Sequence, residues 1–503
     1  KTRPSNIIMA ISCLKSYKST KWLKKYYLVI PMINQNSYQA VMARKNEIMK
    51  KAVGIDYSLY ETGKISFDYE KLMRDNGYPL SGIEAIQKAH GVGSTPLKEL
   101  HNITALARHY CPKGFGARIF IKDEALNDSG SFKARRASVA VYRAKTLGYK
   151  GVIAATSGNY GAAVASQAAK YGLKCIVIQE CYDSHQVGQP EIIEKARACE
   201  AYGAEVIQLS VGPELFYTFL RLLEETGYFN ASLYTPFGIA GIETLGSELV
   251  QDCLVQTKKL PNMVVCTNAG GGNLSGTARG IKKATDKAIT IVGASVNLKG
   301  LHMASDHDFN RKSFTTGHTG FGMPFMTNPD RSDVPRSAAR PLRYIDRYVT
   351  VTQGEVFFMT ETLVALEGIE RGPAGNTSLA AAFSLAQSLP ASQIIVVQET
   401  EYTGAGKHHQ AQLAFAKQNG IKVDFGNPQD EIPGTSIILP SHPGLIKAQE
   451  VDLNQIRQSL VKNSVKNEQF ITEVDLDFLC QETNQDYPWL KNELKKLGIG
   501  VIK

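Results

Sequence analysis

The sequence predicts an α/β fold with mostly parallel sheets. Between residues 115 and 300, short apolar segments rich in β-branched residues alternate with segments of helical periodicity. Such alternation is typical of βαβ units, in which successive strands run parallel. The chain has 503 residues, of which 43% are hydrophobic and 21% are charged, so its apolar surface suffices for a large core in two or more domains.

Six short apolar segments predict strands at 117–122, 151–155, 174–179, 204–209, 263–267 and 289–293. Segments rich in Ala and Gln predict helices between them, at 161–171, 190–202 and 243–255. A later helix and strand are expected at 379–388 and 393–398, whereas residues 300–345 are polar and loop-rich. Ligands of parallel sheets bind at the carboxyl ends of the strands, so the chemistry is expected in the loops that follow them.

The net charge of +10 is concentrated at the start of the chain. Nine of the 57 Lys and Arg residues precede the first acidic residue, Glu47, which leaves 48 basic against 47 acidic residues beyond it. A nucleic-acid-binding domain shows a basic face in its folded part, so this balance argues against that class. Residues 1–40 are expected to be a basic leader that is disordered or non-native, with a targeting peptide as the alternative.

The remaining composition excludes two further classes of protein. No apolar run reaches the roughly 20 residues that a membrane span requires, so we expect no membrane segment. The eight cysteines include no C-x-x-C pair, which predicts reduced thiols in a cytoplasmic protein and no metal site.

The first candidate loop contains Lys133, shortly after the strand at 117–122. Ser129 and Ser131 are suited to cap a helix that begins here, and Gly130 permits a tight entry. A lysine in the first helical turn opposes the helix dipole, so helix stability does not explain it. A desolvated lysine can form a Schiff base, whereas the alternative is a solvated surface lysine.

The second candidate loop follows the strand at 151–155 and contains Thr156, Ser157, Gly158 and Asn159. Hydroxyl, amide and backbone N–H groups there converge on the N-terminus of the next helix. This arrangement suits a carboxylate or a ring oxygen. An ordinary helix cap, formed by Ser157 or Asn159, is the alternative.

The third candidate loop is a glycine triplet, Gly270, Gly271 and Gly272, followed by Asn273. Glycines let the backbone approach an anion closely, and the following helix adds its positive end, so a phosphate is the expected ligand. The loop matches neither the Walker motif nor G-x-G-x-x-G. A flexible turn is the alternative.

The fourth candidate loop follows the strand at 393–398 and contains Thr403 within Tyr402-Thr403-Gly404-Ala405-Gly406. A hydroxyl at this position is suited to hydrogen-bond a heteroaromatic nitrogen. A plain strand-to-helix turn is the alternative.

In their order along the chain, the four loops resemble those of the fold type II, or tryptophan-synthase-β-like, family of pyridoxal-phosphate enzymes. The resemblance covers about residues 90–430 and implies that Lys133 forms the Schiff base with pyridoxal 5′-phosphate. It further implies that loop 156–159 holds the substrate carboxylate and, through Asn159, the cofactor's 3-hydroxyl. Residues 270–273 would hold the phosphate and Thr403 the pyridine nitrogen. The family often has Asp after the lysine, where this chain has Ala134.

This family implies two three-layer αβα domains. We expect residues 41–135 to form N-terminal helices and the start of the large cofactor-binding domain, and 136–240 to form a small αβα domain. Residues 241–430 would complete the large domain. A C-terminal helical appendage is expected at 431–503, where Leu453, Ile456 and Leu460 lie on one helical face.

Several longer segments are similar to β subunits of 2-amino-4-oxopentanoate thiolases, at residues 42–47, 93–97, 151–164, 187–190 and 236–246. This similarity implies thiolytic cleavage of that substrate with coenzyme A to acetyl-CoA and alanine, in ornithine degradation. It also implies a small partner subunit and a homodimer. The basic residues considered for coenzyme A contacts, each better explained as a surface charge, are Arg135, Arg136, Lys299, Arg311 and Lys312.

Two alternatives remain open from the sequence. One is a different reaction of the same family on a small amino acid, such as that of a threonine synthase or an amino-acid ammonia-lyase. The other is a catalytically silent scaffold subunit that kept the fold, against which the presence of Lys133 and the glycine triplet argues.

Overall fold

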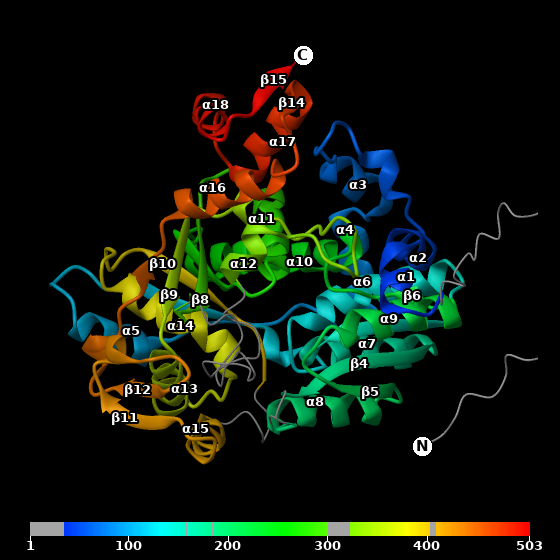
Figure 1. The fold of residues 1–503 in the computed structure, drawn as a ribbon. Helices are drawn as coiled ribbons and strands as arrows, with labels where there is room; N and C mark the ends of the chain where they lie inside the picture. The colour runs from blue at the N-terminus through cyan, green and yellow to red at the C-terminus, as the bar shows by residue number, and fades with distance from the viewer. Residues whose placement is uncertain are drawn as a thin grey trace, which may run out of the picture.

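In the computed structural model, the chain forms two main sheets with helices packed on them (Figure 1). The structure describes residues 35–156, 158–183, 186–188, 190–299, 322–402 and 409–502. Most of the expected leader therefore lies outside the described residues, as do Ser157, Thr403, Arg311 and Lys312.

Within the described residues, the larger sheet has seven strands in the order β1–β2–β10–β7–β8–β9–β13. The five inner strands are parallel, and the edge strands β1 and β13 are antiparallel to their neighbours. The bounds are β1 Leu97–Glu99, β2 Arg118–Asp123, β10 Ile394–Glu399, β7 Met263–Thr267, β8 Thr290–Val296, β9 Arg347–Val351 and β13 Gln449–Glu450.

Helices cover both faces of this sheet. Side chains point alternately to the two faces along each strand, so both faces present apolar residues that helices bury. In β2, Ile119 and Ile121 pack with one group of helices, whereas Phe120 packs with the other. The first group is α5 His101–His109, α13 Gln353–Glu367 and α14 Pro373–Ala386. The second group is α10 Pro236–Thr257, α11 Gly272–Ala284 and α16 Leu453–Ser464.

The smaller sheet is parallel, in the order β5–β4–β3–β6. Its bounds are β5 Glu205–Ser210, β4 Lys174–Tyr182, β3 Gly151–Thr156 and β6 Phe229–Asn230. The chain reverses its direction across the sheet after β5, so right-handed crossovers place α7 and α8 on one face and α9 on the other. These helices are α7 Asn159–Tyr171, α8 Pro190–Ala201 and α9 Glu214–Thr226, and α6 Lys133–Thr146 lies beside α7.

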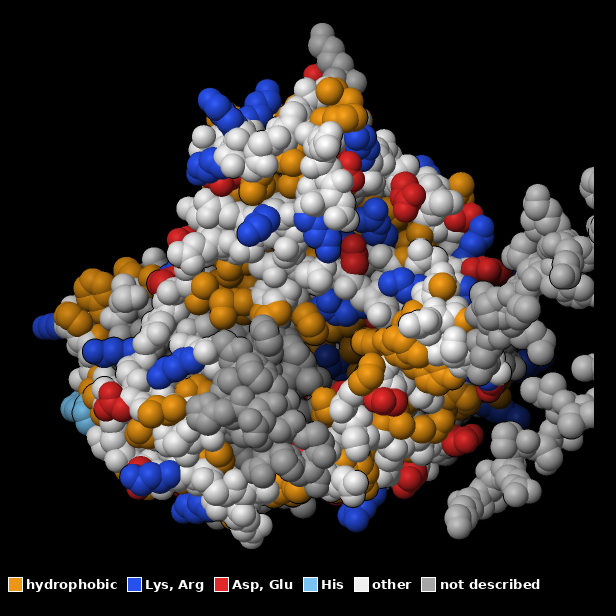
Figure 2. All heavy atoms as spheres, viewed as in Figure 1, with side chains coloured by type: hydrophobic (Ala, Val, Ile, Leu, Met, Phe, Trp, Pro, Cys, Tyr) orange, Lys and Arg blue, Asp and Glu red, His pale blue; other side chains and the backbone are white. Residues whose placement is uncertain are grey.

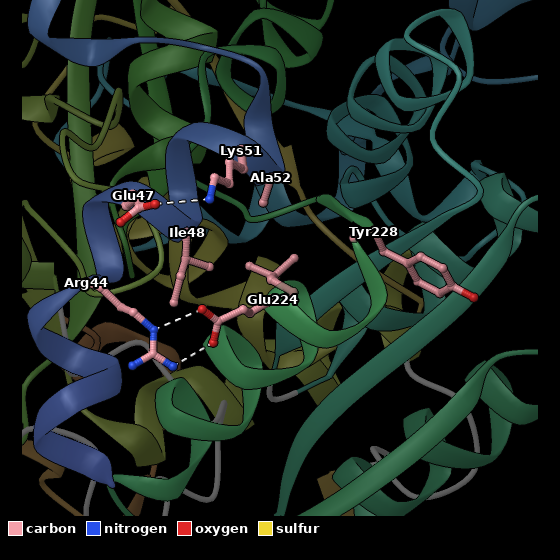
Figure 3. Close-up of a pocket in the computed structure, with 9 residues that line it drawn as sticks. Arg44, Glu47, Ile48, Lys51, Ala52, Glu224 and Tyr228 are labelled. Atoms are coloured by element: carbon pink, nitrogen blue, oxygen red, sulfur yellow. Dashed lines mark hydrogen bonds and ion pairs between the residues drawn. The ribbon is translucent and has the colours of Figure 1, made fainter. Parts of the chain in front are cut away.

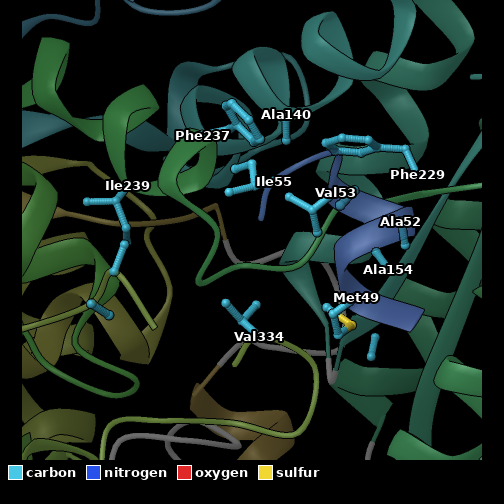
Figure 4. Close-up of a cluster of buried hydrophobic side chains, with 14 of the residues drawn as sticks. Met49, Ala52, Val53, Ile55, Ala140, Ala154, Phe229, Phe237, Ile239 and Val334 are labelled. Atoms are coloured by element: carbon cyan, nitrogen blue, oxygen red, sulfur yellow. The ribbon is translucent and has the colours of Figure 1, made fainter. Parts of the chain in front are cut away.

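Of the N-terminal helices, α1 and α2 pack against α9 and the smaller sheet, whereas α3 and α4 contact α10. Met49, Ala52 and Val53 of α2 reach the same buried cluster as Phe229 and Phe237 (Figure 4). The bounds of these helices are α1 Tyr38–Ala43, α2 Lys45–Val53, α3 Tyr69–Asn76 and α4 Leu80–Lys88. Burial of these apolar side chains fixes the start of the described chain on the small domain.

A small hollow of about 190 Å³ lies between α2 and α9 (Figure 3). The guanidinium of Arg44 donates to both carboxylate oxygens of Glu224, at 2.9 and 2.7 Å, and Lys51 pairs with Glu47. Each of these charges is paired with an opposite charge of the protein. We therefore interpret the hollow as a gap between two surface helices and not as a ligand site.

The remaining elements lie mostly toward the C-terminus. Leu453, Ile456 and Leu460 of α16 lie in the same buried cluster as residues of α10 and α11, so this helix belongs to the core on one face of the larger sheet. The other elements are α12 Gly322–Thr327, α15 His409–Gln418, β11 Lys422–Gly426, β12 Ser436–Pro440, β14 Phe470–Thr472, α17 Glu473–Thr483, α18 Tyr487–Lys496 and β15 Gly500–Ile502.

Every strand predicted from the sequence is confirmed, with ends displaced by at most three residues. The helix expected at 243–255 begins earlier, at Pro236, because Thr235 caps it and proline suits its first position. In the part of the chain that the structure describes, no helix is long and apolar enough to cross a membrane. No group of three His, Cys, Asp or Glu side chains there is placed to hold a metal ion.

Close packing of α10 on α11 positions the glycine triplet, which lies at the start of α11. Glycines make the approach possible: a Cβ on Gly280 would lie 2.8 Å from the carbonyl carbon of Glu243, and one on Gly276 would lie 2.8 Å from Ile242 Cγ2. Such distances are shorter than van der Waals contact, so neither position accepts a side chain without movement of the two helices.

We therefore expect Gly280→Ala to lower the free energy of unfolding by about 1–3 kcal/mol, as overpacked core positions do. The matched control is Gly82→Ala in α4, where a Cβ would make an ordinary 3.4 Å contact with Pro79. Alanine in place of a helical glycine adds up to about 1 kcal/mol there. Urea unfolding of both variants checks this, and equal midpoints would contradict the packing argument.

Candidate active site

A cavity of about 390 Å³ lies between the two sheets and is lined by residues of both. In the space-filling view, a hollow opens between the two halves of the molecule and is bordered by hydrophobic side chains (Figure 2). The loops that follow β3 and β7 line the cavity, together with the start of α6 and the residues after β10. The volume suits a small organic ligand.

Lys133 is the first residue of α6, and it lines this cavity in a half-buried position. The loop before it is attached to the residues after β10: Phe132 N donates to Thr400 O at 3.0 Å, and Tyr402 N donates to Gly130 O at 2.8 Å. The backbone N–H of Lys133 donates to Ser131 Oγ at 3.3 Å. These bonds fix where the lysine enters the cavity.

Asn159 begins α7, and its side chain lies at the cavity beside Glu401. The amide nitrogen of Asn159 donates to the Glu401 carboxylate, whereas its Oδ1 is buried with no hydrogen-bond partner among the described residues. Thr156 Oγ1 accepts from Gly158 N at 3.1 Å, which shapes the turn. Three of the four residues predicted in this loop, Thr156, Gly158 and Asn159, line the cavity.

The glycine triplet also lines the cavity, and each of its positions is closed to a side chain. A Cβ on Gly270 would collide with the ring of Tyr234, one on Gly271 would lie 2.9 Å from Pro341 Cδ, and one on Gly272 would lie 2.9 Å from Arg136 Cζ. Gly271 has a φ of +80°, which favours glycine. The loop therefore brings bare backbone and the free N–H groups of the α11 N-terminus to one wall.

Asn273 connects the triplet to β10. Its Nδ2 donates to Gln398 Oε1, and its Oδ1 is buried without a hydrogen-bond partner in the described chain. The cavity thus brings together Lys133, Thr156, Gly158, Asn159 and residues 270–273, all predicted as site residues. The predictions for Ser157 and Thr403 concern positions outside the described residues.

The structure adds cavity residues that the loop motifs did not indicate. Arg136 and Tyr234 border the glycine triplet, and Asp333 and Glu401 present carboxylates. Burial lowers the pKa of Arg136 and raises the pKa of Asp333, because both lie where water is excluded. Arg136 follows Lys133 by three residues on one helix, so helical spacing was the available signal for it.

The neighbouring Arg135 is not a surface charge, contrary to its expected exposure. It is fully buried and makes ion pairs with Glu124 and Glu248, both at 2.7 Å. Burial of such a pair requires that each charge be compensated. Arg135 therefore stabilises the first turn of α6. Its charge is compensated inside the protein, so it is not suited to bind coenzyme A.

The residues present fit pyridoxal 5′-phosphate, the cofactor implied by the sequence. The glycine triplet brings the N-terminus of α11 to the cavity, where a phosphate would meet backbone N–H groups, and Lys133 lines the same cavity. The buried oxygens of Asn159 and Asn273, which have no hydrogen-bond partner among the described residues, are acceptors that donor groups of a bound ligand would satisfy. Fold and cavity together fit the class of enzymes that use a phosphorylated carbonyl cofactor.

Comparison with known proteins agrees with this class. Residues 88–401 match the family model described as pyridoxal-phosphate dependent enzyme. A cysteine synthase from Entamoeba histolytica has the same fold, with a TM-score of 0.50 and 21% identity over 63% of this chain and 87% of that one. The chain belongs to the family of pyridoxal-phosphate dependent enzymes.

Two relatives match this chain over almost its whole length. The 2-amino-4-ketopentanoate thiolase beta subunit of Acetoanaerobium sticklandii is 68% identical over 93% of this chain and 100% of its own length. A protein with the same description from an unknown prokaryotic organism is 61% identical, again over 93% of this chain and 100% of its own length. The similarity between this chain and the thiolase beta subunits, expected from five segments, is confirmed over 93% of this chain.

We expect Lys133→Ala to abolish covalent attachment of the cofactor. Borohydride reduction of the wild-type protein should leave a pyridoxyl group on the chain, visible as added mass. The same treatment of the variant should add none, because the reacting amine is gone.

The control is Lys195→Ala. Lys195 also lies near the cavity, with its Cγ 3.9 Å from where a Cβ on Gly158 would lie. That variant should keep the added mass. Retention of the pyridoxyl group in Lys133→Ala would mean that another amine holds the cofactor.

Proposed function

We propose that this chain is the catalytic beta subunit of a 2-amino-4-oxopentanoate thiolase, the compound also called 2-amino-4-ketopentanoate. The observation that carries the proposal is the 68% identity to such a subunit over its entire length. The reaction joins the acetyl group of the substrate to coenzyme A and releases alanine, as a step of ornithine degradation. The cavity between the sheets supports it, because a lysine, a phosphate cradle and an amide-bearing loop meet there.

The reaction breaks the bond between C3 and C4 of the substrate. The thiol of coenzyme A adds to the C4 carbonyl, the acetyl group stays on sulfur, and C3 takes up a proton to become the methyl group of alanine. The cofactor, when bound, supplies an electron sink for the negative charge that bond breaking leaves on the amino-acid fragment. The protein supplies binding, orientation and proton transfer.

Lys133 is the residue proposed to move the proton at the α carbon, because its amine enters the cavity from the first turn of α6. Thr156, Ser157, Gly158 and Asn159 are proposed to hold the substrate carboxylate at the N-terminus of α7. Asn159 would also reach the cofactor's 3-hydroxyl. The placement of Asn159 against Glu401 supports this role, because it positions the amide at the cavity wall.

Thr403 is proposed to face the pyridine nitrogen of the cofactor. A hydroxyl is neutral, so this nitrogen would stay largely unprotonated, and the ring would withdraw electrons less strongly than a pyridinium. A neutral hydroxyl beside the pyridine nitrogen suits a reaction in which negative charge develops at the β carbon of the substrate. Gly270, Gly271, Gly272 and Asn273 are proposed to hold the phosphate.

The proposal includes partners and a location. The relatives are named beta subunits, which implies a second subunit, and we propose that a small one completes the coenzyme A site. Homodimerisation and a cytoplasmic location are further parts of the proposal. The free buried thiols of Cys175, Cys199 and Cys266 fit a reducing compartment.

The alternative reactions are those of a threonine synthase or an amino-acid ammonia-lyase, which would use the same cofactor and the same loops. The full-length identity to thiolase subunits favours thiolysis over both. A silent scaffold subunit is disfavoured, because Lys133 and the triplet both line a cavity of adequate size.

An assay of the purified chain with 2-amino-4-oxopentanoate and coenzyme A, with and without the partner subunit, tests the proposal. We expect acetyl-CoA and alanine in equal amounts in the presence of the partner, and none from Lys133→Ala. The same samples should release no ammonia from threonine or serine. Ammonia release with no acetyl-CoA would instead support the lyase alternative.

A further inference from the structure

Two adjacent arginines of α6 are buried in different electrostatic environments. Arg135 is 0% exposed and is compensated by Glu124 and Glu248. Arg136 is 2% exposed, yet none of the ion pairs between described residues includes it, and the side chains that act on its charge are those of Tyr160 and Tyr234. A buried cation without a counter-charge is costly, so its presence calls for an anion that the chain itself does not supply.

The hydrogen bonds of Arg136 are also incomplete. Its Nη2 donates to the carbonyl oxygen of Leu233, whereas its Nε is buried and has no acceptor among the described residues. The rings of Tyr160 and Tyr234 lie 5.9 and 6.0 Å from its guanidinium carbon. Aromatic faces hold a guanidinium in place but provide no acceptor for its N–H groups.

The position of this guanidinium identifies the kind of anion. It lines the cavity beside Gly272, where an added Cβ would be 2.9 Å from Arg136 Cζ. Gly272 is the first residue of α11, so the cation and the free N–H groups of that helix face the same space. A phosphate group carries about two negative charges near neutral pH and matches the planar donors of arginine.

We propose that Arg136 is a cationic ligand of the cofactor's phosphate group, in addition to the backbone of the glycine triplet. The inference rests on the cofactor and not on the thiolysis proposed above, so it holds for any reaction that this chain catalyses. It adds a charged side chain to a site that the loop motif describes by glycines alone. Arg136 is thereby assigned to the cofactor and not to coenzyme A.

The test compares two ligands that differ only in the phosphate. Apoenzyme of the full chain is titrated with pyridoxal 5′-phosphate and with pyridoxal, and the dissociation constants are measured by absorbance. We expect Arg136→Gln to weaken binding of the phosphorylated ligand by about 10- to 100-fold, as loss of a charge-assisted hydrogen bond does. Binding of pyridoxal should change less than about threefold, because it lacks the group that Arg136 contacts.

The control is Arg143→Gln. Arg143 lies on the same helix, also has a buried Nε without a partner, and stacks on Phe237 at 5.4 Å, but it does not line the cavity. This variant should bind both ligands as the wild type does.

Equal weakening of both ligands by Arg136→Gln would overturn the proposal, since it would show a structural role only. Unchanged binding of both would overturn it as well. Should Arg136→Gln fail to fold, Arg136→Lys keeps the charge but loses the planar donors. It should weaken only the phosphorylated ligand, by about tenfold, and an equal effect on pyridoxal would again contradict the assignment. Neither outcome depends on acetyl-CoA formation, so failure of this inference is distinct from failure of the proposed function.

Discussion

The carboxyl end of β10 holds the candidate active site together. Gln398 accepts from Asn273 of the glycine-triplet loop, Glu401 accepts from Asn159 of the second loop, and Thr400 accepts from Phe132 beside the lysine. Three loops from two sheets are thus attached to four consecutive residues. Because β10 lies inside the larger sheet, between β2 and β7, these attachments start from a rigid element.

Charge compensation distinguishes the structural part of α6 from its functional part. In the buried network of Arg135, Glu124 and Glu248, each charged group has a partner of opposite charge at hydrogen-bond distance. Along the same helix, Lys133 and Arg136 lie one turn apart and line the cavity. The helix therefore combines an arginine held in buried ion pairs with residues that line the cavity, and this division explains how Arg135 and Arg136 differ in environment.

Much of the fold and the site was predictable from local sequence. Parallel strands buried on both faces read as continuous apolar segments, such as the residues of β7, and this pattern made seven strands recognisable: β2, β3, β4, β5, β7, β8 and β10. The short strands β1, β6 and β13, and also β9, were not predicted. The candidate loops could then be predicted from the strands, because ligands of parallel sheets bind in the loops after the carboxyl ends of the strands. Helical spacing places Arg136 on the same face as Lys133, but its burial without a counter-charge was not predictable, because that environment depends on Leu233, Tyr234 and Gly272, which are distant in sequence. The early start of α10 and the packing of α16 on the large sheet depend likewise on tertiary contacts.

The central claim is that one cofactor bridges Lys133 and the glycine triplet across the cavity. A crystal structure of the full chain grown with pyridoxal 5′-phosphate tests it most directly. The account predicts continuous density from the Lys133 amine to the cofactor ring, with the phosphate seated against residues 270–272. Density for the cofactor on a different amine, or a phosphate distant from the start of α11, would contradict it.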